Sequence, residues 1–162
     1  NVFNARFNQF YNPLNKNSQS NAGSCTVDND TQISVVSPAE DPSEPSNPVD
    51  VTVTTPNGTS AMSSADQFTY LPKVDSISPT SGPEAGGTTV TITGSGFTGA
   101  TAVSFGSTAG TDVTVVSDTQ ITVVSPAGSG RVDVTVTTSA GTSQTSTADQ
   151  FTYTPVIVIS GG

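Results

Sequence analysis

The chain has 162 residues, a net charge of -9, 32% hydrophobic residues, one cysteine and no histidine. Its 4 basic residues against 13 acidic ones repel phosphate backbones and anionic head groups, so we expect no nucleic-acid partner, and no apolar run is long enough for membrane insertion. Without histidine, Ser-His, Cys-His and His-metal centres are excluded, so we expect no catalytic residue, no metal site and no cofactor, and only a carboxylate-based hydrolase stays open as an enzyme.

The sequence contains two copies of one module. Three stretches recur almost unchanged: residues 30–39 as 118–127, 49–55 as 132–138 and 65–70 as 148–153. The copies differ in length at one loop, which is long and acidic in the first copy and short in the second. From this repeat we place the first module at residues 1–71, the second at 72–155 and a separate segment at 156–162.

The first module is expected to lack its opening strand. When the N-terminal residues are aligned so that Phe10 falls on Phe97, Phe3 falls on Val90 and Ala5 on Ile92. Asn1 then corresponds to the start of the second strand of the complete copy. Because the chain starts at Asn1 with neither Met nor a signal peptide, we expect a processed product or an excerpt of a longer protein.

The aromatic N-terminal segment is a candidate acceptor or partner-contact segment. Its members are Phe3, Phe7, Phe10 and Tyr11. They are interpreted as strand residues of the first module, but Phe3, Phe7, Phe10 and Leu14 also fit one stripe of a helix. The segment from Phe3 to Tyr11 can alternatively serve as an arm that binds a partner.

Two further features of the first module are interpreted as structural, each with a functional alternative. Cys25 has no second cysteine in the chain, so it is expected to be a small buried hydrophobic residue, or else to pair between chains. The oxygen-rich run Asp28, Asn29 and Asp30 is expected to be a solvated turn, with a cation site as the alternative.

The second copy predicts about seven short strands. Apolar residues alternate with Thr, Ser or Asp in each of them, and Gly or Pro residues separate them, as is typical of a β-sandwich with one apolar face per sheet. The alternating residues are Val74 to Ser78, Val90 and Ile92, Val103 and Phe105, Val113 and Val115, Ile121 and Val123, Val132 to Val136, and Phe151 and Tyr153.

The second copy resembles the IPT/TIG family of immunoglobulin-like domains from residue 74 to residue 155. The motifs that carry the resemblance are residues 76–83 (SISPTSGP), 86–97 (GGTTVTITGSGF) and 103–106 (VSFG), and the repeat extends it to about residues 26–70. The resemblance implies an all-β fold of two tandem immunoglobulin-like β-sandwich modules, found on surface proteins and receptors, with no catalytic residues. The members that bind DNA use basic loops, which this acidic chain lacks.

Glycines and aromatic residues of the second copy have predicted structural roles. Gly94 and Gly96 are expected to supply positive φ angles at the corner before the first buried aromatic side chain. The aromatic residues are expected to fill the space between the sheets, and they are Phe97, Phe105, Phe151 and Tyr153.

The most apolar run of the chain follows the second module. Residues 156–160 align with the start of the opening strand, residues 73–77, and have no module behind them. The apolar members of this run are Val156, Ile157, Val158 and Ile159. An exposed strand of this kind promotes aggregation unless something covers it. Either the sequence ends within a longer tandem array, or this candidate inter-subunit strand completes the first module of a neighbouring copy.

Three functions of different classes remain. The first is a structural subunit or stalk of an extracellular filament on a cell or virion surface, a homo-oligomer assembled head to tail. The second is an adhesion or carbohydrate-binding module, and the third is a spacer of a larger secreted protein. In the last two cases the partners are neighbouring modules of a longer chain.

Overall fold

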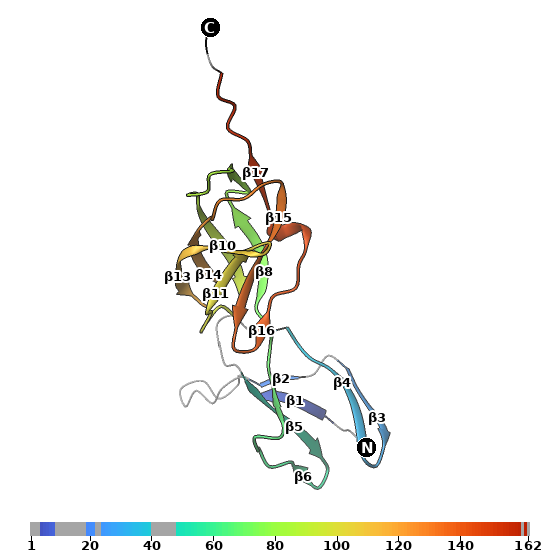
Figure 1. Cartoon of the computed structure of the whole chain (residues 1–162). Coiled ribbons are helices and arrows are strands. Elements are labelled where there is room, and N and C mark those ends of the chain that lie inside the picture. Colours follow the sequence, from blue (N-terminus) through green and yellow to red (C-terminus); the bar gives the residue numbers. More distant parts are fainter. Residues whose placement is uncertain (1–3, 9–18, 22–23, 40–47, 160, 162) are drawn as a thin grey trace. The chain divides into compact units, whose positions relative to one another are not determined.

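The computed structural model describes residues 4–8, 19–21, 24–39, 48–159 and 161. The chain divides into two compact units, unit 1 from Asn1 to Tyr70 and unit 2 from Leu71 to Gly162 (Figure 1). Both units consist of β-strands, and the described residues add only one short 3-10 helix, so the predicted all-β class is confirmed. No helix that is long and apolar enough to cross a bilayer occurs in the described part of the chain.

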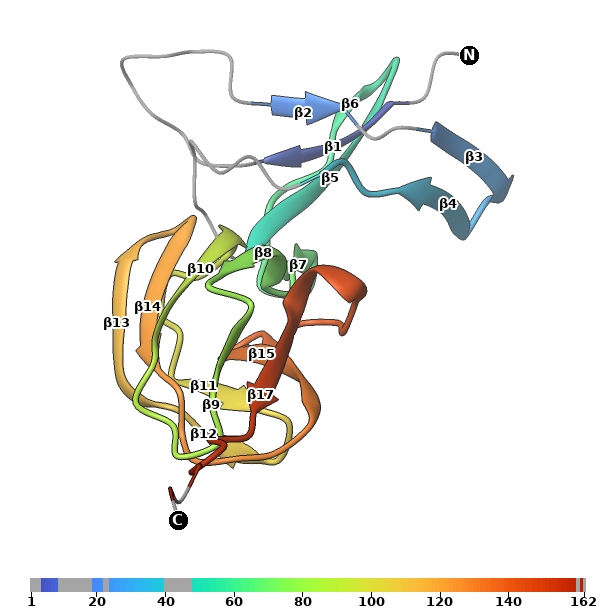
Figure 2. The same cartoon turned by 90° about the horizontal axis from the view of Figure 1, so that it is seen from above.

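Unit 2 is a sandwich of two sheets. Its elements are β8 (Lys73–Ser78), β9 (Ser81–Pro83), β10 (Thr89–Ser95), β11 (Ala102–Phe105), β12 (Thr108–Ala109), β13 (Thr111–Ser117), β14 (Gln120–Val124), β15 (Arg131–Thr138), β16 (Gly141–Thr142), η1 (Thr147–Asp149) and β17 (Gln150–Thr154). One sheet has the order β13-β14-β10-β8, and the other has the order β12-β11-β15-β17-β9 with β16 beside β15. Figure 2 shows β13, β14 and β10 on one side of the unit and β11, β15 and β17 on the other. All seven predicted strands are present, and β9, β12 and β16 are additional short strands.

The core of unit 2 lies between the two sheets and is formed by the alternating side chains. The four predicted aromatic residues are buried, which confirms their core role. The ring of Phe151 packs edge to face on Phe105 at 5.2 Å and on Tyr153 at 5.1 Å between centroids. The apolar members of the core are Val74, Ile77, Val90, Ile92, Phe97, Val103, Phe105, Ile121, Val123, Val134, Val136, Phe151 and Tyr153.

The two glycines of β10 and the following corner have different roles. Gly96 has a φ of 70°, as expected. The expectation of a positive φ at Gly94 is wrong, because Gly94 is required by close packing. A Cβ there would lie 1.9 Å from the carbonyl oxygen of Lys73 and 2.7 Å from the Phe97 ring. This contact lies where the register of β10 and β8 shifts after Thr93.

Unit 1 is a reduced version of the same architecture. Its strands are β1 (Asn4–Asn8), β2 (Gln19–Asn21), β3 (Ser24–Asn29), β4 (Gln32–Val36), β5 (Val49–Thr55), β6 (Gly58–Thr59) and β7 (Gln67–Phe68). One sheet has the order β2-β1-β5-β6 with β7 also beside β5, and β3 and β4 form a separate hairpin. Among the side chains that the structure describes in this unit, only Val49 and Thr52 are buried.

The register of β1 corrects the predicted alignment of the N-terminal segment. Phe7 pairs with Val51 of β5, in the way that Phe105 of β11 pairs with Val134 of β15. Therefore β1 corresponds to β11, and β2 to β12, whereas the alignment had placed Phe3 and its neighbours on β10. The helical interpretation is also wrong for residues 4–8, which form a strand. The described part of unit 1 consequently contains a counterpart of neither β8 nor β10, so it is short of two strands and not only of the opening one.

Candidate functional site

The C-terminal apolar segment lies in solvent. Val156, Ile157, Val158 and Ile159 are 66%, 81%, 83% and 87% exposed, respectively. The segment follows β17 and has no strand pairing, so the expectation of a strand there is not met within a single chain. Figure 1 shows it leading away from the β17 end of the sandwich. Four adjacent β-branched side chains without cover form an unusual apolar patch on an acidic protein.

The β3–β4 hairpin of unit 1 differs from the corresponding strands β13 and β14 of unit 2 at one edge. By the repeat, β4 corresponds to β14, which lies between β13 and β10. In unit 2, Ile121 and Val123 lie opposite Ile92 and Val90 of β10, and both are 0% exposed. The corresponding Ile33 and Val35 of β4 are only half-buried, and the described part of unit 1 contains no strand in the place of β10.

The aromatic N-terminal candidates are only partly described. Phe3, Phe10 and Tyr11 lie outside the described residues. The backbone of Phe7 pairs with Ser20 on one side of β1 and with Val51 on the other. Both edges of β1 are thus occupied by strands of its own unit.

The acidic run of unit 1 forms a turn between β3 and β4. The Asn29 side-chain oxygen accepts hydrogen bonds from the backbone N–H of Thr31 at 2.9 Å and from its hydroxyl at 2.8 Å. The carboxylate of Asp28 accepts a hydrogen bond from Ser34. No group of three or more acidic, Cys or His side chains placed to hold a metal occurs among the described residues. Cys25 on β3 is a free thiol and half-buried, so it is less enclosed than expected.

A buried carboxyl group at η1 was not singled out from the sequence. Asp149 is 0% exposed, and its carboxylate accepts a hydrogen bond from the backbone N–H of Ser146 at 2.8 Å, while the Ser146 hydroxyl accepts one from the N–H of Ala148. Burial raises the pKa of Asp149, the hydrogen bond from Ser146 lowers it, and the nearby charge of Asp133 raises it further. The Ser-x-x-Asp capping-box pattern is the signal that identifies this position, and the repeat contains it again at Ser63 and Asp66.

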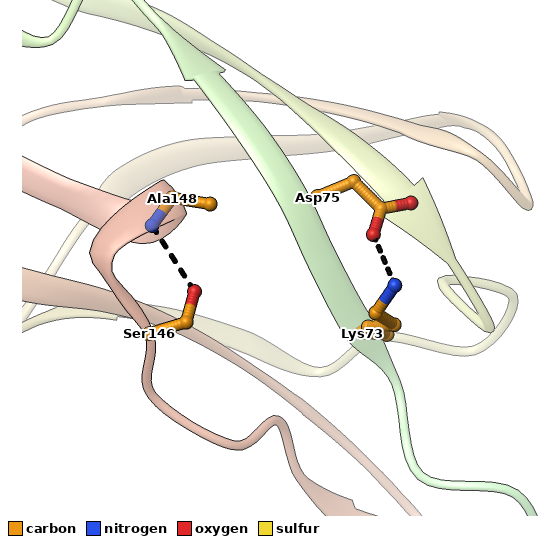
Figure 3. A network of polar contacts seen from close by, with 4 residues as sticks. All are labelled: Lys73, Asp75, Ser146 and Ala148. Atoms are coloured by element: carbon orange, nitrogen blue, oxygen red, sulfur yellow. Dashed lines mark hydrogen bonds and ion pairs between the residues drawn. The ribbon is translucent and has the colours of Figure 1, made fainter.

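An ion pair lies on β8, at the start of unit 2. Figure 3 shows this pair, formed by Lys73 and Asp75, together with the Ser146–Ala148 hydrogen bond of η1. The ion pair is 2.5 Å long, and its side chains are 72% and 50% exposed. An exposed pair of this kind contributes little to stability.

A second structural carboxylate holds the corner that follows β10. Asp118, in the turn between β13 and β14, accepts hydrogen bonds from the backbone N–H groups of Gly96 and Thr98, each at 3.1 Å, and from the Thr98 hydroxyl at 2.7 Å. The corner carries Phe97, which is fully buried. Asp118 is therefore a structural residue, and its role depends on long-range pairing that the local sequence does not reveal.

The two-sheet arrangement and its strand order define an immunoglobulin-like β-sandwich. Residues 72–153, half of the chain, match the family model of the IPT/TIG domain. The chain belongs to the IPT/TIG family, as the sequence motifs indicated. A search of curated proteins finds no match.

Three solved structures are similar to the chain at low identity. The SGBP-B protein of a xyloglucan utilization locus in Bacteroides uniformis is 22% identical, with a TM-score of 0.43, and the match covers 86% of this chain and 39% of that one. A crystal structure with a xylogluco-oligosaccharide is 22% identical with a TM-score of 0.48, covering 91% and 33%. The full extracellular region of plexin A4 is 15% identical with a TM-score of 0.46, covering 94% and 24%. The chain thus spans well under half the length of these proteins, and the similarity is too low to transfer a ligand or a partner.

Proposed function

We propose that the chain is a structural subunit of an extracellular filament or stalk, built from tandem immunoglobulin-like modules and joined head to tail by strand donation. The observation that carries this proposal is the exposure of Val156 to Ile159 beside a sandwich whose other large apolar side chains are mostly buried. An acidic surface and a family without catalytic residues support a mechanical role over a chemical one.

Burial of the exposed segment contributes to binding a partner. Full burial of a Val or Ile side chain contributes about 1.5–3 kcal/mol, so the two side chains on the buried face of a donated strand contribute about 3–6 kcal/mol. Association costs about 4–15 kcal/mol in lost freedom of motion. The apolar contacts therefore offset part of this cost, and the backbone hydrogen bonds of a new strand pair add to them.

The geometry of donation determines the form of the assembly. A donor segment in unit 2 and an acceptor edge in unit 1 are different surfaces, so each subunit has one of each. Such a heterologous contact extends into an open chain unless its rotation closes a ring. The expected product is a filament whose modules follow one another in series.

The test compares the chain with a variant that lacks residues 156–162. Multi-angle light scattering and negative-stain electron microscopy over a range of concentrations should show linear oligomers for the intact chain and monomers for the truncated one. A matched control replaces Val156 and Val158 with Thr and keeps the length of the segment. If the intact chain stays monomeric at all concentrations, strand donation is refuted.

A second candidate, adhesion through a carbohydrate site, has one observation in its favour. Phe68 and Tyr70 form an edge-to-face pair at 5.0 Å between centroids, and Phe68 is 37% exposed. Aromatic faces at a surface are suited to stacking on sugar rings. Binding on a glycan array that is lost in the Phe68→Ser variant would favour this function.

A further inference from the structure

We propose that the C-terminal segment of one copy takes the place of a β10 counterpart in unit 1 of a second copy, against the edge of β4 with which no described strand pairs. This inference rests on the proposed function and specifies its acceptor site and register. The occupant is a second copy of this chain, and residues 157 and 159 face the core of the acceptor unit.

The register follows from the pairing inside unit 2. Strands β10 and β14 are antiparallel, with Val90 opposite Val123 and Ile92 opposite Ile121. In unit 1 the repeat places Val35 at the position of Val123 and Ile33 at that of Ile121. A donor strand in the place of β10 therefore needs two apolar residues, two positions apart, opposite Val35 and Ile33.

The donor segment matches the apolar pattern of β10. When Ile157 is placed on Val90, Ile159 falls on Ile92, and Ser160 and Gly161 fall on Thr93 and Gly94. Both core positions are then apolar, and the Thr-Gly end of the strand is reproduced as Ser-Gly.

A place corresponding to β8 is less suited because of its pairing partner. The repeat alignment puts Ile159 on the exposed Ser76 and Ser160 on Ile77, whereas a shift by one residue puts Val156 on Val74 and Ile159 on Ile77. The β8 counterpart would have to pair with a β10 counterpart, as β8 does in unit 2. The described part of unit 1 contains no such strand, whereas β4 is present and can accept a β10-like strand directly.

The route of the chain through unit 2 favours a second copy over the same chain. Strand β17 is parallel to β9, which continues the course of β8, so the chain leaves unit 2 at the end opposite to the one where it enters from Tyr70. Residues 155–162 span at most about 27 Å when fully extended. The strand β15 has 8 residues and alone covers about 26 Å. Returning along unit 2 would consume the whole segment before it could pair with β4.

The two pairing strands are uncharged, although each chain carries a net charge of -9. Neither the donor segment nor β4 contains a charged side chain. The pairing surfaces are thus a neutral apolar strand and a neutral half-buried edge, which are suited to strand addition between two acidic proteins.

Disulfide trapping between two variants tests the register. Both variants carry Cys25→Ser; the donor adds Ile157→Cys and the acceptor adds Val35→Cys. Directly opposed residues of an antiparallel pair have Cα atoms about 4.5–5.5 Å apart, within the range of a disulfide. On mixing and mild oxidation, the donor–acceptor dimer should exceed, by at least about tenfold, that formed with Ser34→Cys as acceptor, because a shift by one residue turns the side chain to the other face.

A substitution series provides a second readout that does not depend on cysteine. Ile157→Asn and Ile159→Asn should each abolish assembly of the full chain, whereas Val156→Thr and Val158→Thr should preserve it, since these positions correspond to the Thr residues of β10. If assembly persists in Ile159→Asn and no dimer is trapped at Val35, the proposed register is wrong while the filament stands. Trapping only within a monomeric chain that carries both cysteines would overturn the second-copy assignment. If the unmodified chain does not assemble, the proposed function fails as well.

Discussion

Replacing Asp118 with Ala should destabilise unit 2 by removing the anchor of the corner that carries Phe97. The carboxylate accepts three hydrogen bonds, from the backbone N–H groups of Gly96 and Thr98 and from the Thr98 hydroxyl. Hydrogen bonds to a charged group contribute about 1.5–3 kcal/mol each when isolated, but Asp118 is half-buried and its bonds share one group. We expect a loss of about 2–4 kcal/mol in the free energy of unfolding, against a total of about 5–15 kcal/mol for a typical domain.

Urea denaturation followed by circular dichroism measures this loss, and amide hydrogen exchange localises it. The N–H groups of Gly96 and Thr98 should lose protection before the strands do. Asp30 occupies the same place in the repeat, in the exposed turn of unit 1, so Asp30→Ala makes the same change in charge and should shift stability by less than about 0.5 kcal/mol. Equal effects of the two substitutions would show that charge, and not the anchored corner, determines the result.

Three further predictions concern unit 2. Phe151→Ala should cost about 3–5 kcal/mol in a thermal or urea unfolding assay, because the side chain is fully buried between Phe105 and Tyr153, and a cost below about 1 kcal/mol would contradict this packing. Gly94→Ala should cost about 1–3 kcal/mol or more, because its Cβ would collide with the Lys73 carbonyl oxygen, whereas Gly161→Ala, with open space around it, should leave unfolding of the chain unchanged. Because the pKa of Asp149 is raised in the folded state, the protonated carboxyl group contributes stability that is complete below the pKa of the unfolded chain and is lost as the pH rises through the pKa of the folded state. Asp149→Asn should therefore flatten this part of the curve of unfolding free energy against pH. An unchanged curve would refute the assignment.

The sequence predicts unit 2 well because local patterns and long-range packing agree there. Val90, Ile92, Ile121 and Val123 alternate with polar residues, and each of these apolar side chains faces the core. The role of Gly94 could not be predicted, since it depends on the Lys73 carbonyl of a strand distant in sequence from it.

The sequence predicts unit 1 less well because its first strand has no such pattern. The β1 sequence NARFN has only Ala5 and Phe7 as apolar residues, so it fits several positions of the repeat equally. Pairing with β5 determines its place, and this pairing lies outside any local window. The exposed C-terminal segment was found from its apolar run, but its fit to the β4 edge required the observation that β1 takes the position of β11.

The parallel pairing of β9 with β17 has a mechanical consequence. Ser81, Gly82 and Thr152 belong to a short ladder that joins the first and last parts of unit 2, and the chain enters and leaves at opposite ends. A tensile force applied through the two ends drags β9 and β17 past each other lengthwise. The hydrogen bonds between them are then loaded together and not opened one after another like a zipper, so this small ladder resists stretching of the module, together with the pairing of β8 and β10.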